Sequence, residues 1–215
     1  MPWYGTFLLG ILSGIITSLF VKLMLDSFEH FRKIIPPKLR KSFDCEFKNQ
    51  KQAEKSILKD AKNSNFMYVF AMKGGSFCAP PTDETNRGLT EIFKWDLEQR
   101  YLISALDNPY LEVRKKELTD GIALDEGIRT SYKYLINGCK DPTRHIRFSM
   151  HKEVVRFRLI IFDQALYISF QPKDKRGITS PMQRYLRESS GYIALKAFFD
   201  EKWEEYKKEE YKKDD

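Results

Sequence analysis

The sequence predicts an α/β domain in which a mixed β-sheet is flanked by helices, preceded by one transmembrane α-helix. Strand and helix patterns alternate from Gln50 to the C-terminus, and such alternation is typical of a sheet with helices on both faces. The first charged residue is Lys22, so the chain opens with a long apolar segment. With 215 residues, the chain fits one ordinary domain and an appendage.

The apolar opening predicts a membrane anchor over residues 1–27, because a bilayer is crossed by about 20 apolar residues. A cleaved signal peptide is disfavoured, since no basic region precedes the run and no small-residue cleavage site follows it. A buried helix is disfavoured because the segment is apolar all round. Basic residues follow the segment, so the positive-inside rule predicts a single-pass protein of the inner (plasma) membrane, with its N-terminus outside and its C-terminal domain cytoplasmic.

Small residues recur at every fourth position of this segment, at Thr6, Gly10, Gly14 and Ser18. Such a stripe lets two membrane helices approach closely, so it predicts a homo-oligomer; the alternative is that Gly and Ser are simply common in membrane helices. Residues 28–48 form a predicted basic linker, whose charges suit the anionic headgroups of the lipid bilayer.

Residues 49–208 are predicted to form the cytosolic domain and residues 209–215 a charged tail. Short apolar or aromatic runs predict strands at 66–72, 101–106, 146–150, 156–162 and 165–170, the last two joined as a hairpin. Helical periodicity predicts helices at 50–62, 85–97, 110–118, 126–136 and from about residue 192. Gly138 suits a helix C-cap, and the polar stretch 172–190 is predicted to be a loop.

Several classes of site are not expected from the composition. The three cysteines form no CxxC pair and His30, His145 and His151 have no metal-ligand spacing, so neither a disulfide framework nor a metal is expected. The GxGxxG fingerprint and the GxxxxGK phosphate loop are absent, and no cofactor is expected. The formal net charge is +7, but the charge from residue 42 onward is roughly balanced, so nucleic acid is not an expected partner.

The strand predicted at 156–162 begins with two arginines, Arg156 and Arg158, and Asp163 follows it. Positions two apart share a face of a strand, so both guanidiniums point the same way. Because burying an unpaired charge is costly, they need water or an anion, and a guanidinium pairs well with phosphate or carboxylate. The alternative is an ordinary strand entrance at which neighbouring acids pair with the arginines.

The pattern R-x-R-x-x-x-x-D of residues 156–163 resembles the HxKxxxxD strand of phospholipase D-like (HKD superfamily) enzymes. Arg156 stands at the histidine position, Arg158 at the lysine position, and Ser169 near the family's serine. The runs FMYVFAM-KGGSF and YLISALDNP resemble the family's half-barrel layout, and the whole resembles an uncharacterised bacterial branch over roughly residues 64–203. In the family the histidine attacks phosphorus, which an arginine cannot do. The resemblance therefore implies a degenerate domain that keeps phosphate-binding geometry rather than an enzyme.

The predicted ligand site combines this strand with polar residues at the ends of other strands. Its members are Arg156, Arg158, Asp163, Ser169, Lys73, Gly74, Gly75, Ser76, Asp107 and Arg114. Residues 73–76 offer an ammonium group and backbone amides, and Asp107 lies at a strand end, where α/β sites gather. Each has a structural alternative: a simple turn for 73–76, a helix cap for 107–109, and an ion pair of Arg114 with Glu112 or Glu117.

Three alternative functions are consistent with these observations. The first is a bacterial membrane-anchored sensor or effector whose domain binds a phosphorylated ligand, for example a nucleotide signal in antiviral or stress defence, by analogy with such systems. The second is a membrane-tethered phosphodiesterase or nuclease, which requires a histidine facing the two arginines. The third is a ligand-free module that recruits a cytosolic partner, which an exposed apolar patch and acid-paired arginines would favour.

Overall fold

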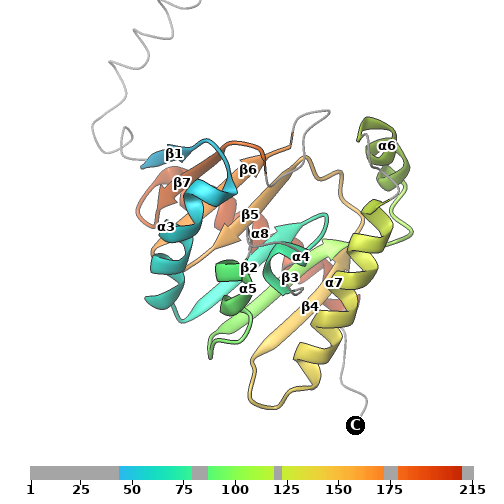
Figure 1. Cartoon of the computed structure of the whole chain (residues 1–215), viewed down its shortest axis with the longest axis horizontal. Helices are drawn as coiled ribbons and strands as arrows, with labels where there is room; N and C mark the ends of the chain where they lie inside the picture. Colours follow the sequence, from blue (N-terminus) through green and yellow to red (C-terminus); the bar gives the residue numbers. More distant parts are fainter. Residues whose placement is uncertain (1–43, 79–86, 119–122, 172–178, 210–215) are drawn as a thin grey trace, which may run out of the picture. The chain divides into compact units, whose positions relative to one another are not determined.

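Seven strands form a single mixed sheet in the part of the chain that the computed structural model describes, residues 44–78, 87–118, 123–171 and 179–209 (Figure 1). In sheet order the strands are β1 (Cys45–Phe47), β7 (Met182–Leu186), β6 (Ala165–Phe170), β5 (Phe157–Ile161), β2 (Phe66–Ala71), β3 (Glu98–Ser104) and β4 (Ile146–His151). Strands β2, β3 and β4 are parallel, and the remaining pairs are antiparallel. The ends of β2, β3, β4 and β6 and the starts of β5 and β7 therefore share one end of the sheet, which we name the C-terminal edge.

Helices cover both faces of this sheet (Figure 1). One face packs against α3 (Gln50–Lys62), α4 (Gly75–Cys78), α5 (Arg87–Ile92) and α7 (Ala123–Lys140), and the other against α8 (Ser190–Tyr206), which continues into η2 (Lys207–Glu209). Alternation along β2 serves both layers, because Met67 and Val69 join the α3–α7 face whereas Tyr68 and Phe70 join the α8 face. The short helix α6 (Tyr110–Glu117) follows β3 and contributes Leu111 to a third, smaller buried cluster.

Most of the predicted elements are confirmed. The predicted helix 50–62 coincides with α3, whose N-cap Asn49 accepts a hydrogen bond from the backbone N–H of Gln52. The strand at 66–72, the helix at 110–118 and the hairpin at 156–170 match β2, α6 and β5–β6 within one or two residues. The predicted loop 172–190 is wrong in part, because it contains β7. The predicted linker range 28–48 contains β1, which pairs with β7.

The transmembrane helix in the predicted fold class is contradicted. Across the described ranges, no helix is both long enough and apolar enough to cross a membrane. The same finding contradicts the predicted location as a single-pass protein of the inner membrane with a cytoplasmic C-terminal domain. The predicted anchor, residues 1–27, and its stripe of Thr6, Gly10, Gly14 and Ser18 lie outside the described residues, as does most of the predicted linker.

Candidate functional site

The fold brings all but one of the predicted site residues to the C-terminal edge. Lys73, Gly74, Gly75 and Ser76 follow the end of β2, and Asp107 follows β3. Arg158 lies at the start of β5 and Arg156 directly precedes this strand. Ser169 lies near the end of the neighbouring strand β6, and Arg114 lies in α6. These segments are up to about a hundred residues apart in sequence and meet because β2 and β3 run antiparallel to β5.

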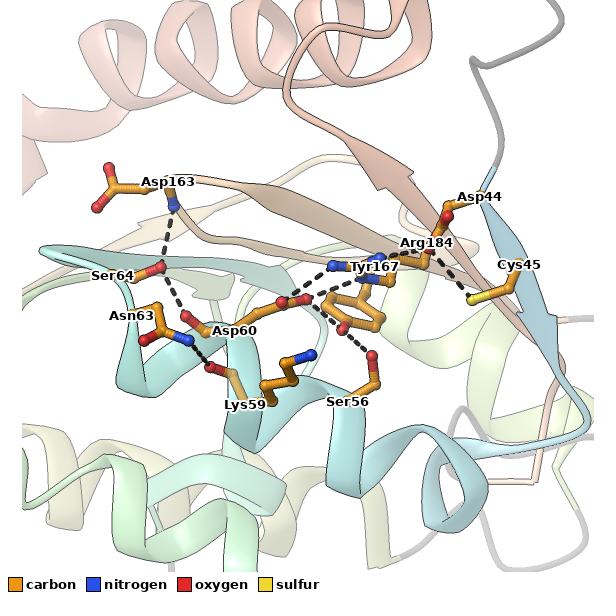
Figure 2. A network of polar contacts seen from close by, with 10 residues as sticks. All are labelled: Asp44, Cys45, Ser56, Lys59, Asp60, Asn63, Ser64, Asp163, Tyr167 and Arg184. Carbon is orange, nitrogen blue, oxygen red and sulfur yellow. Dashed lines mark hydrogen bonds and ion pairs between the residues drawn. The ribbon is translucent and has the colours of Figure 1, made fainter.

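Asp163 is the exception, because it lies at the opposite end of the hairpin. It is five residues from Arg158, or roughly 16 Å along an extended strand. Its carboxylate accepts hydrogen bonds from the backbone N–H and the side-chain amide of Asn65, at 2.5 and 3.0 Å. Its own N–H donates to the hydroxyl of Ser64, a contact drawn in Figure 2. Asp163 therefore fastens the β5–β6 turn to the start of β2 and does not face the arginines.

Arg158 is a buried cation without an acidic partner among the residues that the structure describes. The residue is 5% exposed, and its position in β5 faces the same layer as Ile160, where the strand pattern places an apolar side chain. It pairs in register with the fully buried Ser169. Its guanidinium carbon lies 5.8 Å from the ring centroid of Phe77 in α4. The sequence therefore puts a charge where this face of the sheet otherwise holds Val69, Ile160 and Tyr167.

Two nitrogens of this guanidinium, Nε and Nη2, are buried and have no hydrogen-bond partner in the described part of the chain. Burial lowers the pKa of Arg158 to about 10, with no neighbouring carboxylate to raise it again. Nε and Nη2 share one edge of the planar group, and this edge can donate two parallel hydrogen bonds to a phosphate or carboxylate. A buried polar group left unsatisfied requires an explanation, such as a water or an ion.

Arg156 differs from Arg158 because it already has an acidic partner, Glu117. One carboxylate oxygen of Glu117 contacts Nη2 of Arg156, and the other accepts a hydrogen bond of 3.0 Å from Nη1 of Arg114. Glu117 is 12% exposed in its side chain, Arg114 is buried, and Arg156 is half exposed. Arg114 and then Arg156 hold the pKa of Glu117 below its usual range. The alternative interpretation, pairing with a neighbouring acid, therefore holds for Arg114 and Arg156, which share Glu117.

Residues 73–76 mainly build the entrance to α4. The carbonyl of Gly74 accepts hydrogen bonds from the N–H groups of Phe77 and Cys78, at 2.9 and 3.3 Å, which holds Phe77 over Arg158. Lys73 is exposed and its stem lies along α7, where a Cβ on Gly127 would stand 2.7 Å from its Cδ. The glycine at position 127 therefore leaves room for the lysine.

Asp107 and Asn108 have structural partners at the start of the segment that leads into α6. Asp107 is exposed and pairs with Lys152 at 2.5 Å, which lowers the pKa of Asp107. The next residue, Asn108, accepts from the N–H of Tyr110 and donates to the Ser104 hydroxyl and the Glu153 carbonyl. Asn108 therefore ties the segment just before α6 to the ends of β3 and β4, while the N-cap position of the helix is Pro109.

Neither described histidine faces Arg158. His151 lies on the α8 face, stacked on Phe70 with ring centroids 4.6 Å apart. Its Nδ1 accepts from the N–H of Glu153, so Nε2 carries the proton that is donated to the Ala71 carbonyl at 3.2 Å. Burial lowers the pKa of His151 to about 4. His145 is exposed at the other end of β4, and His30 lies outside the described residues.

Arg184 in β7 is an arginine with a structural role, and its guanidinium is paired with acidic side chains (Figure 2). Its Nε and Nη2 donate to the two carboxylate oxygens of Asp60, at 2.9 and 3.0 Å, and its Nη1 donates to Asp44. Tyr167 donates to the same Asp60 carboxylate at 2.6 Å and lies 2.7 Å from the Ser56 hydroxyl. Arg184 therefore has acidic partners on both edges, whereas Arg158 has none among the described residues.

The described residues offer no ligand set for a metal ion. Within the described ranges, no group of three or more His, Cys, Asp or Glu side chains is placed to hold a metal ion. The candidate site is thus a site for an anion, formed by Arg158 and the polar groups around it at the C-terminal edge.

Comparison with known proteins adds little. No protein-family model matches the chain, and no curated protein matches it. Among solved structures, the archaeal chromatin protein TrmBL2, whose structure shows a novel mode of DNA binding, is similar with a TM-score of 0.43 and 11% sequence identity. The similarity covers 94% of this chain and 68% of that chain. A likeness of this degree carries no argument about function, so the resemblance to phospholipase D-like domains and the expected absence of nucleic acid stay predictions.

Proposed function

We propose that this domain binds a small phosphate-bearing ligand at the C-terminal edge of its sheet, and that Arg158 is the anchor of the site. The observation that carries the proposal is a buried guanidinium with two unsatisfied nitrogens and no acidic partner among the described residues. A fall in pKa from 12.5 to about 10 corresponds to a cost of about 3 kcal/mol for the charged form. A ligand anion would offset this cost, as the Asp60 carboxylate does for Arg184.

The unsatisfied edge of Arg158 offers two parallel donors, which match two oxygens of one phosphate or carboxylate group. One further consideration favours phosphate. The resemblance of residues 156–163 to the phospholipase D-like strand, with Arg158 at the lysine position, points to the same ligand group. The proposal is binding without cleavage, since an arginine is no nucleophile and neither described histidine faces Arg158.

Thermal unfolding of the full chain in the presence and absence of inorganic phosphate, phosphosugars and nucleotides tests this function. A ligand that binds only the folded state raises the unfolding temperature, and the rise grows with the logarithm of ligand concentration once this exceeds the Kd. We expect phosphate to stabilise the wild type and to have no effect on Arg158→Met. Without phosphate, Arg158→Met should match or exceed the wild type, because it removes an unpaired buried charge and keeps a side chain of similar length beside Phe77.

The matched control is Arg187→Met, which removes the same charge from an exposed position at the other end of β7. This variant should keep the phosphate response. A wild-type protein that unfolds at the same temperature with and without every phosphate compound, or an Arg158→Met variant that keeps the full response, contradicts the proposed function.

A second candidate function is a module that binds a protein partner at the same edge. Large apolar side chains are exposed on segments that enter or leave this edge: Tyr110 and Val113 of α6, Val154, and Phe170, at 43% to 54% exposure. The pairing of Arg156 with Glu117 agrees with this candidate as well. Absence of any phosphate response in a folded wild type would favour it over ligand binding.

A further inference from the structure

Glu117 already places an anion beside the proposed site. Its two carboxylate oxygens each contact one guanidinium, those of Arg156 and Arg114, in the way that two oxygens of a bound phosphate would. Arg156 directly precedes β5, and its carbonyl accepts a hydrogen bond of 2.7 Å from the N–H of Gln171, so the pairing with the chain after β6 extends to this residue. In an extended chain, the Cα atoms of residues two positions apart are about 7 Å apart. A phosphate on the free edge of Arg158 therefore lies within reach of Arg156, but only if Arg156 leaves Glu117.

The two arginines differ in their freedom to move. Arg158 is fixed within the sheet and covered by Phe77, whereas the side chain of Arg156 is half exposed. Helix α6 is held on one side by Leu111, while its Tyr110 and Val113 are exposed. Glu117 is the last residue of this helix, so its ion pairs fasten the end of α6 to the start of β5.

We propose that Glu117 is a built-in competitor for the ligand: it neutralises Arg156 and Arg114 in the empty domain, and a phosphate bound to Arg158 displaces its carboxylate from Arg156. This inference rests on the proposed function. The competition costs the same ion-pair free energy for every anion that displaces Glu117, so it lowers the affinity of the site without favouring one anion over another. Displacement of Glu117 from Arg156 also releases the end of α6 from the start of β5.

Calorimetric titration of the wild type and of Glu117→Gln with inorganic phosphate and with acetate tests the competition. The substitution keeps the shape of the side chain and removes its charge. We expect the affinity for phosphate to rise roughly three- to tenfold, as for the loss of one competing ion pair. The affinity for acetate should rise by no larger a factor, because the lost ion pair is the same for both anions. The control is Glu112→Gln on the same helix, whose partner is Lys115 and whose side chain is 71% exposed; it should change neither affinity.

Hydrogen exchange of the wild type provides a second readout that needs no substitution. Phosphate should speed exchange of the backbone amides at the end of α6, at residues 113–117. If wild type and Glu117→Gln bind phosphate equally, or the variant binds more weakly, or α6 becomes better protected with phosphate, Glu117 is not a competitor and only fastens the helix. If neither protein binds phosphate, the proposed function itself fails. Binding by the variant alone supports both ideas.

Discussion

At the scale of single residues, two arginines with different surroundings decide where the site lies. Arg184 is partly exposed and meets Asp60 and Asp44, so its charge is compensated and its role is to hold strands and helix together. Arg158 is more deeply buried, at 5% exposure, and has no acid within the described part of the chain, so its burial costs stability. A residue that costs stability and gains nothing from its neighbours is a candidate for function.

His151 supplies a prediction at the same scale, because it is buried in its neutral form. Its pKa in the folded protein, about 4, lies below the ordinary value of 6.5. The unfolded chain therefore binds a proton between these values while the folded protein does not. Stability is fully present above pH 6.5 and falls by about 3 kcal/mol as the pH drops to about 4.

Urea unfolding between pH 4 and pH 7 measures this effect. His151→Phe keeps a ring against Phe70 and should remove this part of the pH dependence, whatever its effect on stability at pH 7. The exposed His145, changed to Asn, should leave the slope as in the wild type. A slope that is unchanged in His151→Phe would show that His151 is not buried as a neutral ring.

At the scale of secondary-structure elements, Asp163 lies at the turn of the β5–β6 hairpin, at the end of the hairpin that is remote from the site. Asp163→Ala removes the acceptor for two donors of Asn65 and should lower the free energy of unfolding by about 1 kcal/mol. Since the residue lies at the far end of β5, the phosphate response should remain that of the wild type. Thermal unfolding of this variant with and without phosphate measures both quantities. Loss of the response in a folded Asp163→Ala variant would place the ligand elsewhere.

The sequence predicts elements well where their pattern is strong. Strand β2 and the hairpin β5–β6 were predictable because they are continuous apolar runs, which only a strand covered on both faces needs. Strand β7 was missed because only Met182 is fully buried in it, so its MQRYL sequence has no apolar alternation. Gly138, expected as a cap, lies inside α7, where a Cβ would stand 2.6 Å from the Phe93 ring.

At the scale of the whole domain, the sheet topology determines which residues meet. The sequence predicts that Arg156 and Arg158 share a face; in the structure Arg158 pairs with Ser169 within β5, and Arg156 directly precedes this strand. It cannot predict that Glu117 reaches Arg156, because 39 residues separate them and the contact depends on the order of β3, β2 and β5 in the sheet. It also cannot predict that Asp163 lies far from the site, because proximity in sequence suggests the opposite. The α/β class with helices on both faces is confirmed, and the transmembrane helix is not.

A crystal structure of the protein soaked with tungstate, a phosphate analogue with a strong anomalous signal, tests directly whether Arg158 anchors a phosphate site. We expect an anomalous peak within hydrogen-bond distance of both Nε and Nη2 of Arg158, at the C-terminal edge of the sheet. The same soak of Arg158→Met crystals should give no peak there. A wild-type structure in which this edge of Arg158 faces only protein atoms, with tungstate bound elsewhere or not at all, would show that Arg158 is not the anchor.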